Sequence, residues 1–426
     1  MKTVAATYRV QPAILQGNLD VPPSKSITHR ALLMAALSRR PVRIRKILDA
    51  EDTRLTLDAI HRLGYEFIRE GDTVTFTGIH HPPAEYPVTL YVGNSGTTAR
   101  LITAVAAIQS VPVVIDGTPR MRQRPMAPLF DALRQLGVTV EDSGGFLPAT
   151  LSGGKIVGNR VTIDPRASSQ FVSALMLIAP LLPQGLRIHL SHPPSSRSYI
   201  ELTQGILHRF GVPSTWENTD IAIPAAAPQP PDEFTVEGDF SSASYALIGA
   251  HLTGGKICAT NLHVDSLQGD REILSILAAS GAKIHHTENG ICVEGTGKPQ
   301  PVEWDMQHCP DLVPGVAVMC LFASGPSVLK HVSHLRFKES DRIEAICKNA
   351  ERLGGTVTFR DGHLYIHPRP LHGGTIEPYN DHRIAMAFAL AGLRVTGVDI
   401  LNPDCVEKSY PQFWEHLESV SKPRVT

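Results

Sequence analysis

Positively charged side chains recur where this sequence predicts the first turns of helices. Cations oppose the positive end of the helix macrodipole, so this placement is unfavourable unless an anion lies among them. Backbone N–H groups at helix starts bind anions, and arginine adds a fork suited to carboxylate or phosphate. The sequence therefore predicts a pocket for a small molecule with several negative charges. The cations concerned are Lys25, Arg30, Arg100, Arg120, Arg122, Arg124, Arg197, Lys338, Arg342, Arg383 and Lys408.

Carboxylates lie among these cations. Asp311 opens a predicted buried helix, and Glu339 falls within the run Lys338–Arg342, where acidic and basic residues are mixed. In a closed pocket such groups are available for proton transfer. A simpler interpretation makes Glu339 half of an ion pair on a solvated helix face and makes His382 a capping residue. Both interpretations stay open from the residues alone.

The elements that carry these residues follow an internal repeat. A small polar cluster is followed by about a dozen mostly apolar, Ala-rich residues, six times, at separations of 69 to 74 residues. A second, amphipathic series ends in glycine five times, at separations of 70 to 74 residues. The first series is marked by Ser26, Ser95, Ser169, Ser241, Asp311 and Asp381, and the second by Gly64, Gly137, Gly211, Gly281 and Gly354.

Each repeat predicts a strand, a buried helix, a strand, an amphipathic helix and a hairpin, which is a βαβαββ unit in the α/β class. Three units fill residues 21–235 as a first lobe, and three more fill 236–426 as a second. Residues 224–231 are rich in Pro and Ala and predict a linker, with a hinge near 224–240. Residues 1–20 contain a strand-like segment able to complete a sheet of either lobe. If two faces of helix starts oppose each other across the hinge, they enclose the anionic ligand.

Composition excludes several classes of function. The chain has 426 residues, 40 Lys+Arg against 41 Asp+Glu, and a formal net charge of -1. Such a balance provides no general field for nucleic acid or an acidic membrane, and aromatic residues are only 6%. The longest apolar stretch, Phe171–Leu182, is shorter than a bilayer span, and Met1–Gln16 lacks the apolar core of a signal peptide. We therefore expect a cytosolic protein that acts as a monomer, without nucleic acid or membrane partners.

The cysteines follow no metal-binding or disulfide pattern. All six lie in the second half of the chain, and no two form a C-x-x-C pair. We expect neither a disulfide framework nor a zinc site, and no cofactor. The cysteines are Cys258, Cys292, Cys309, Cys320, Cys347 and Cys405.

Six motifs, in order along the chain, resemble the signature segments of the 3-phosphoshikimate 1-carboxyvinyltransferase (EPSP synthase) family of enolpyruvyl transferases. The resemblance implies a two-lobed inside-out α/β barrel with three βαβαββ repeats in each lobe. It places residues 1–20 with 236–426 in the second lobe, beside a first lobe of 21–235. The motifs are Pro22–Arg30, Gly93–Arg100, Pro119–Pro125, Ser168–Gln170, Phe337–Arg342 and Asp381–Arg383.

The family's activity transfers the enolpyruvyl group of phosphoenolpyruvate to the 5-hydroxyl of shikimate 3-phosphate, on the shikimate pathway to aromatic amino acids. Carried over by motif, the residues for shikimate 3-phosphate are Lys25, Ser26, Arg30, Ser168, Ser169, Gln170, Ser196, Tyr199, Asp311, His334 and Lys338. Those for phosphoenolpyruvate are Lys25, Asn94, Gly96, Arg124, Gln170, Arg342, Arg383 and Lys408.

The resemblance also implies the chemistry, an addition followed by an elimination. Asp311 is the expected base for the sugar hydroxyl and Glu339 the expected donor of the proton to C3, with Lys25 and His382 assisting. Closure of the lobes on the first substrate is expected to exclude water. Gly96 leaves room beside the phosphoenolpyruvate pocket, so we expect glyphosate to inhibit in competition with that substrate.

This sequence departs from the usual family motif at several positions. Pro23 stands where glycine is usual, His29 and His334 where asparagine is common, and Leu101 where many members have proline. These departures leave the contact of His334 with the sugar phosphate open.

Two alternatives remain from the sequence. UDP-N-acetylglucosamine enolpyruvyl transferase is similar in fold and chemistry, but usually carries a reactive cysteine in the first lobe, where this chain has none. A non-catalytic anion-binding repeat protein retains the cations but has no use for Asp311 and Glu339.

Overall fold

The computed structural model describes residues 6–154 and 156–423. The chain forms two compact units: unit 1 comprises Met1–Pro22 and Glu237–Thr426, and unit 2 comprises Pro23–Val236. Within the described residues, no helix is both long and apolar enough to cross a membrane.

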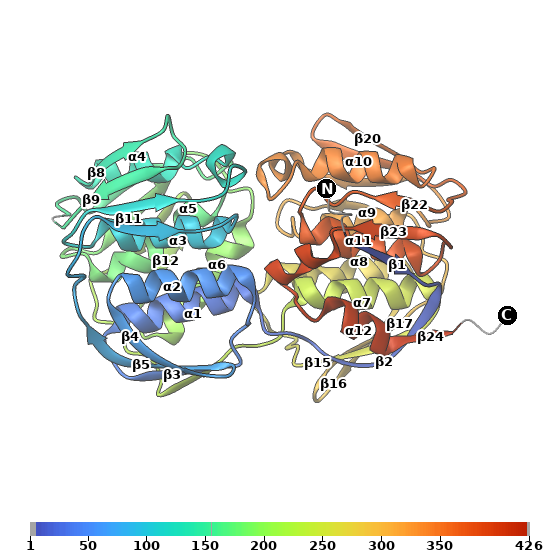
Figure 1. Ribbon diagram of the computed structural model, residues 1–426, viewed down its shortest axis with the longest axis horizontal. Helices are drawn as coiled ribbons and strands as arrows, with labels where there is room; N and C mark the ends of the chain where they lie inside the picture. The colour runs from blue at the N-terminus through green and yellow to red at the C-terminus, as the bar shows by residue number, and fades with distance from the viewer. Residues whose placement is uncertain (1–5, 155, 424–426) are drawn as a thin grey trace. The chain divides into compact units, whose positions relative to one another are not determined.

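Three buried helices form the centre of unit 2 and contact one another: α1 (Lys25–Ser38), α3 (Gly96–Ala107) and α5 (Gln170–Ile178). Every residue of α3 is buried, and Ser26 alone is not fully buried in α1. These helices are Ala- and Leu-rich on all sides, which is the composition of a helix that has no solvent face. The strands lie outside the helices (Figure 1).

Three four-stranded sheets surround these helices. Their hydrogen-bonded orders are β14-β3-β5-β4, β6-β7-β9-β8 and β10-β11-β13-β12, and each sheet contains one parallel pair beside a hairpin. The strands are β3 (Val42–Arg45), β4 (Tyr65–Glu70), β5 (Thr73–His80), β6 (Val88–Tyr91), β7 (Val113–Asp116), β8 (Thr139–Asp142), β9 (Ala149–Ser152), β10 (Arg160–Ile163), β11 (Leu186–Leu190), β12 (Thr215–Glu217), β13 (Asp220–Ile223) and β14 (Glu233–Thr235).

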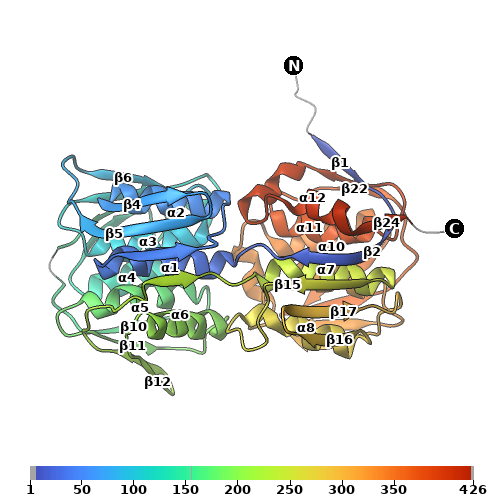
Figure 2. The same cartoon turned by 90° about the horizontal axis from the view of Figure 1, so that it is seen from below.

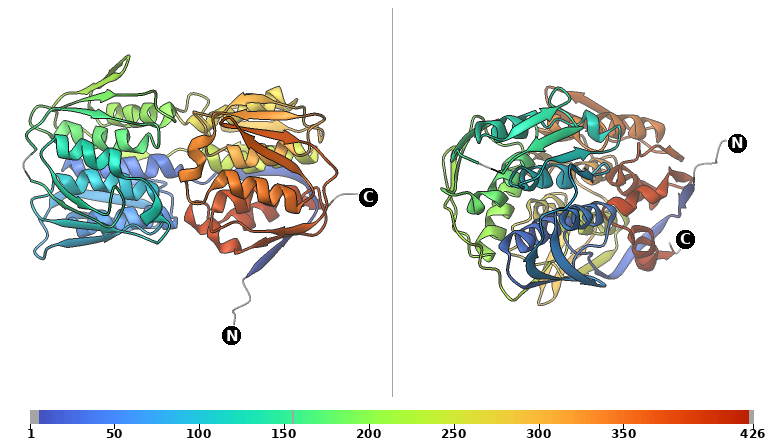
Figure 3. Two further views of the ribbon diagram at one scale, coloured as in Figure 1. Left: turned by 90° about the horizontal axis from the view of Figure 1, so that it is seen from above. Right: turned by 60° about the vertical axis from the view of Figure 1, so that its left-hand side comes forward.

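Unit 1 repeats this plan around α7 (Phe240–Thr253), α9 (Val313–Cys320) and α11 (His382–Gly392), all of whose residues are buried. Its sheets have the orders β16-β17-β15-β2-β24, β18-β19-β21-β20 and β1-β23-β22. Two further views show strands and helices alternating around the centre of each unit (Figure 3). The strands are β1 (Thr7–Val10), β2 (Ala13–Asp20), β15 (Lys256–Thr260), β16 (Lys283–Thr287), β17 (Gly290–Glu294), β18 (Glu303–Asp305), β19 (Ser327–Lys330), β20 (Thr356–Arg360), β21 (His363–His367), β22 (Gly374–Ile376), β23 (Val398–Leu401) and β24 (Ser421–Pro423). The α/β repeat architecture predicted from the sequence is confirmed.

Two strands, β2 and β14, belong to one unit while the helix that follows each of them in sequence belongs to the other unit. β2 precedes α1 in sequence, yet it pairs in parallel with β15 of unit 1, as Figure 2 shows. β14 precedes α7 in sequence, yet it pairs in parallel with β3 of unit 2. The first repeat of unit 2 therefore uses β14, from the C-terminal end of that unit. The first repeat of unit 1 uses β2, from its N-terminal segment.

The amphipathic helices end as their glycine markers predict. They are α2 (Glu51–Arg62), α4 (Ala127–Gln135), α6 (Arg197–Arg209), α8 (Ile273–Ala279), α10 (Arg342–Arg352) and α12 (Phe413–Val420). The five marker glycines that follow the first five helices all have φ between 70° and 99°, the left-handed conformation that glycine adopts at least cost. Asp361 and Gly362, also at positive φ, form the turn between β20 and β21.

Two expectations are wrong. The Pro-rich residues 224–231 lie within unit 2 and are tied to it, because the backbone N–H of Ala226 donates to Pro180 O at 3.0 Å and that of Gln229 to Phe210 O at 2.6 Å. Cys258 and Cys292 form a disulfide, because they are register partners on the antiparallel strands β15 and β17. Their separation of 34 residues gave no sign of this pairing.

Candidate active site

The side chain of Arg342 organises the polar cluster of unit 1. It is the first residue of α10 and 1% exposed. Its guanidinium donates from Nη1 to Asp311 Oδ1 at 2.9 Å, from Nη2 to Glu339 Oε2 at 2.7 Å, and from Nε to Asp381 Oδ2 at 2.8 Å. Burial alone lowers the pKa of Arg342, but these three carboxylates outweigh it and raise the pKa above its ordinary value. The cation is permanently charged and fixes three acids around it.

A second arginine holds the other face of the acids. Arg383 donates from Nη2 to Asp311 Oδ2 at 2.9 Å, so both oxygens of the Asp311 carboxylate are bound to guanidinium groups. Asp381 caps α11 by accepting from the backbone N–H of Arg383 at 3.0 Å. Because one carboxylate joins the start of α10 to the start of α11, the two helix ends are fixed at one site. The interpretation that Glu339 forms an ion pair on a solvated helix face is wrong, because Glu339 is only 9% exposed and its ion pair with Arg342 is buried.

The remaining predicted residues of unit 1 lie around this centre. His334, in the turn Ser333–Phe337, is 8% exposed, and burial followed by the charge of Lys338 lowers its pKa to about 3. It is therefore a neutral imidazole at physiological pH. His382 is fully buried at the start of α11, and Lys408, 4% exposed, ends the turn Pro403–Lys408 that packs on α11.

Unit 2 contains a buried arginine of a different kind. Arg30 is 1% exposed and donates to neutral oxygens: Thr203 Oγ1 at 2.7 Å, Ser26 O at 2.8 Å, Ser173 Oγ at 3.2 Å and Tyr199 O at 3.4 Å. No described carboxylate forms an ion pair with it, and burial lowers its pKa to about 10. A buried charge without a countercharge is costly, so this site favours an anionic ligand.

A second cluster of unit 2 surrounds Gly96 at the start of α3. A Cβ atom at Gly96 would lie 2.4 Å from Arg124 Nη2 and 2.5 Å from Arg100 Nη1, so both guanidinium groups reach the helix start closely. Arg124 Nη1 donates to Asn94 O at 2.9 Å, and Arg100 Nη1 donates to Gln170 Oε1 at 2.8 Å. This geometry brings together Asn94, Gly96, Arg124 and Gln170, four of the residues that the resemblance assigns to phosphoenolpyruvate.

The other residues predicted in unit 2 occupy the starts of its helices. Lys25, 9% exposed, donates to Asp52 Oδ2 at 3.2 Å. Ser168 Oγ accepts from the backbone N–H of Gln170 at 3.2 Å, while Ser169 and Ser196 are the buried N-cap residues of α5 and α6.

The anion argument is wrong for two of the cations. Arg122 pairs with Asp116 at 2.5 Å, and Arg197 pairs with Glu201 at 2.7 Å and lies 4.2 Å from the centre of the Trp216 ring. Both arginines are exposed, so ordinary surface pairing explains them.

Sequence reasoning missed several residues that hold the site. Asp52 is 1% exposed and binds Lys25, but an acid in the first turn of a helix resembles an ordinary response to the helix dipole. Asp381 marks a helix start in the sequence, and its motif does not identify it as the partner of Arg342. Tyr245, on α7, accepts from Arg383 Nη1 at 3.5 Å, and no motif marked it.

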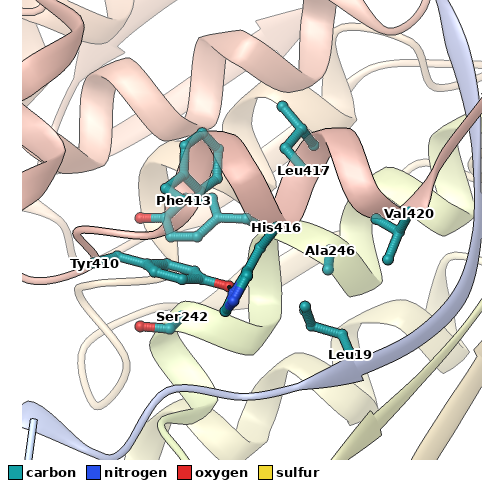
Figure 4. Close-up of a pocket in the computed structure, with 9 residues that line it drawn as sticks. Leu19, Ser242, Ala246, Tyr410, Phe413, His416, Leu417 and Val420 are labelled. Atoms are coloured by element: carbon teal, nitrogen blue, oxygen red, sulfur yellow. Dashed lines mark hydrogen bonds between the residues drawn. The ribbon is translucent and has the colours of Figure 1, made fainter.

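Tyr245 also lines a largely apolar pocket. The pocket lies between α7, α12 and β2 (Figure 4). Tyr410 OH and His416 Nδ1 meet there at 2.9 Å. The pocket has no Lys or Arg in its lining, so it does not meet the requirement for an anion site. It is lined by Leu19, Ser242, Tyr245, Ala246, Tyr410, Phe413, His416, Leu417 and Val420.

Known proteins resemble this chain in both sequence and fold. The family model of EPSP synthase (3-phosphoshikimate 1-carboxyvinyltransferase) matches residues 10–417. The 3-phosphoshikimate 1-carboxyvinyltransferase of Methanoculleus marisnigri is 40% identical over 406 residues, 93% of this chain and 94% of that protein. That of Serratia proteamaculans is 36% identical over 425 residues, 97% and 98% of the two chains. An EPSP synthase structure from Acinetobacter baumannii has a TM-score of 0.81 at 25% identity, over 97% of this chain and 98% of its own. The chain belongs to the EPSP synthase family, whose reaction transfers the enolpyruvyl group of phosphoenolpyruvate to the 5-hydroxyl of shikimate 3-phosphate.

Proposed function

We propose that the clusters of the two units bind and activate the two substrates of this reaction. The observation that carries the proposal is Arg30, a buried guanidinium that no described carboxylate pairs with. A phosphate monoester supplies the missing negative charge. The residues assigned to shikimate 3-phosphate are Lys25, Ser26, Arg30, Ser168, Ser169, Gln170, Ser196, Tyr199, Asp311, His334 and Lys338.

Phosphoenolpyruvate carries a carboxylate and a phosphate, and the residues assigned to it are rich in cations. Arg124 and the start of α3 support this assignment, since a helix start and a guanidinium meet at Gly96. The residues assigned to it are Lys25, Asn94, Gly96, Arg124, Gln170, Arg342, Arg383 and Lys408.

The proposed chemistry transfers protons through two carboxyl groups. In the addition, C3 of phosphoenolpyruvate gains a proton from Glu339, the sugar oxygen bonds to C2, and Asp311 takes the hydroxyl proton. In the elimination, Glu339 takes a proton back from C3 and the C2–O bond to phosphate breaks. The phosphate leaves with the proton held by Asp311, and the enol ether is released. Lys25 and His382 assist by charge and proton supply. Arg342 and Arg383 position Asp311 for this role, because they bind both of its oxygens.

Phosphate release tests the acceptor. The chain is incubated with phosphoenolpyruvate and either shikimate 3-phosphate or UDP-N-acetylglucosamine, and inorganic phosphate is measured. We expect release with shikimate 3-phosphate alone. Release with the nucleotide sugar alone would support the related transferase, and no release with either would support an anion-binding protein without catalysis.

Glyphosate tests the phosphoenolpyruvate assignment. We propose that it inhibits in competition with phosphoenolpyruvate, since Gly96 presents no side chain beside Arg124. Inhibition constants are measured at several phosphoenolpyruvate concentrations, and a resistance that requires millimolar inhibitor would contradict the proposal. The monomeric state and the cytosolic location stay predictions.

A further inference from the structure

Asp270 is a buried acid of unit 1 that no motif or assignment includes. It lies in the turn Gly269–Glu272, before α8, and is 6% exposed. Its Oδ2 accepts a hydrogen bond from the hydroxyl of Ser241, in the first turn of α7, while its Oδ1 has no hydrogen-bond partner in the described structure. An ionised carboxylate with one bare, buried oxygen is costly, whereas the neutral acid is tolerated more easily.

Side-chain hydrogen bonds hold the segment before this turn against the start of α7. Gln268 accepts from the backbone N–H of Phe240 at 3.1 Å and donates to Gly238 O and to Glu237 Oε1, both at 2.7 Å. Ser266 also donates to Glu237. Asp270 therefore follows a fixed segment and has little freedom to turn its carboxyl group toward solvent.

The charged groups that face Asp270 belong to the candidate active site. Burial, followed by the charge of Asp311, raises the pKa of Asp270 to about 7, against the opposing effects of Arg383 and Ser241. Asp239, the N-cap of α7, raises it further. The thiol of Cys309, with its pKa raised by burial and then by Asp270 and Glu272, is a neutral neighbour. Helix α7 joins Asp270 to this site, because Ser241, which donates to Asp270, and Tyr245, which accepts from Arg383 Nη1 at 3.5 Å, lie about one helical turn apart. Arg383 in turn binds Asp311 at 2.9 Å.

We propose that Asp270 is a positioning residue for the transfer reaction: its neutral acid leaves Arg383 available to phosphoenolpyruvate, and its ionised form draws Arg383 away from that substrate. The inference rests on the proposed assignment of Arg383 to phosphoenolpyruvate. It predicts that the affinity for phosphoenolpyruvate falls as the pH rises through neutrality.

Kinetics of the Asp270→Asn variant test the proposal, because asparagine keeps the shape and cannot ionise. The KM for phosphoenolpyruvate is measured from about pH 6 to about pH 8.5 in the native protein, in D270N and in the control D265N, which removes an exposed acid of the same loop. The substrate's own ionisation affects all three proteins equally. We expect the ratio of KM, native protein over D270N, to rise about five- to tenfold across this range. The D265N ratio and the KM for shikimate 3-phosphate should stay level.

Stability supplies a readout that needs no turnover. The folded chain holds a proton on Asp270 that the unfolded chain releases near pH 4, so the native protein loses stability between about pH 4 and about pH 7 and then no more. D270N lacks this loss, and its melting temperature should rise relative to the native protein over that interval. Ser241→Ala removes the hydrogen bond that favours the ionised form and should move the KM transition to higher pH.

The two readouts separate the inference from the site assignment on which it rests. A KM ratio that is flat with pH would overturn the role of Asp270 in phosphoenolpyruvate binding. Equal pH dependence of melting in D270N and the native protein would overturn its neutral state. If D270N loses more than about a hundredfold in kcat at pH 6 while folding normally, the carboxylate itself is required and the proposal is wrong. Failure of the site assignment would instead appear as unaltered phosphoenolpyruvate kinetics in an Arg383 variant.

Discussion

Arg30 in unit 2 and Arg342 in unit 1 are equally buried, at 1% exposed, but have opposite surroundings. Arg342 is bound by three carboxylates, which raise its pKa, while Arg30 is bound by hydroxyl and carbonyl oxygens, and burial lowers its pKa to about 10. A guanidinium paired with three acids holds those acids in place, and its buried charge is compensated before any substrate binds. A guanidinium surrounded by neutral oxygens still requires an anion. The two units thus perform different tasks with the same side chain.

The largest expected effect concerns an acid that Arg342 holds. Asp311→Asn keeps the shape of the side chain but removes the base, and a positioned base contributes about 10²–10⁴ in rate. We expect kcat to fall by that factor with a smaller change in either KM, measured by phosphate release. Asp305→Asn, an exposed acid on β18, is the control and should keep full activity. A fully active D311N protein would reduce Asp311 to a structural partner of Arg342.

The comparison also predicts that replacement by methionine lowers stability at Arg342 but not at Arg30. Arg342→Met removes this cation from the buried carboxylates of Glu339 and Asp381 and leaves Asp311 its bond to Arg383, and breaking a buried ion pair costs about 3–5 kcal/mol. Urea unfolding of the full chain should show that loss. Lys348→Met, on the same helix and in an exposed pair with Glu344, should change the free energy of unfolding by less than about 0.5 kcal/mol. An unchanged stability in R342M would show that the cluster is not held by this charge.

Much of the fold was accessible from sequence because burial imposes a period. Six helices without a polar face and five glycines at helix ends recur every 69 to 74 residues, and the structure has each of them. The pairing of β2 with β15 and of β14 with β3 could not be predicted from the sequence, because in each case the two strands are far apart along the chain. The disulfide was missed for the same reason, since strand register, not spacing, brings Cys258 to Cys292.

The site was predictable where motifs mark it and unpredictable where single residues support it. Arg30, Gly96 and Arg342 stand in recognisable runs. Asp52 and Asp270 are lone acids near helix starts, where capping and dipole effects provide a sufficient explanation. Only the folded structure shows that Asp52 binds Lys25. It also shows that Asp270 is buried within the electrostatic influence of Asp311 and Arg383. The sequence likewise could not separate Arg122 and Arg197, which form surface pairs, from the cations of the site.

Arg30→Met sharpens the comparison through binding. Because no described carboxylate is left unpaired by its removal, we expect the free energy of unfolding without ligand to stay level or rise. Loss of charged hydrogen bonds worth about 1.5–3 kcal/mol should raise the KM for shikimate 3-phosphate about tenfold to a hundredfold. The KM for phosphoenolpyruvate should change much less. A large loss of stability with unchanged KM would give Arg30 the structural role assigned to Arg342.

Gly96→Ala tests whether Arg100 and Arg124, which lie close to Gly96, also contact phosphoenolpyruvate. The new methyl group would meet Arg124 Nη2 at 2.4 Å and Arg100 Nη1 at 2.5 Å, both at the ends of flexible side chains. These guanidinium groups can move, so stability should change by less than about 1 kcal/mol, while the KM for phosphoenolpyruvate should rise up to about tenfold.

Gly325→Ala is the matched control for this change, because its Cβ would meet only Pro301, at 3.6 Å. Both kinetic constants of that variant should match those of the native protein. If G96A leaves the KM for phosphoenolpyruvate unchanged, the displaced guanidinium groups do not contact that substrate. Among the described cations of unit 2, Arg30 would then be the one whose surroundings favour an anionic ligand, and the contrast with Arg342 would rest on Arg30 alone.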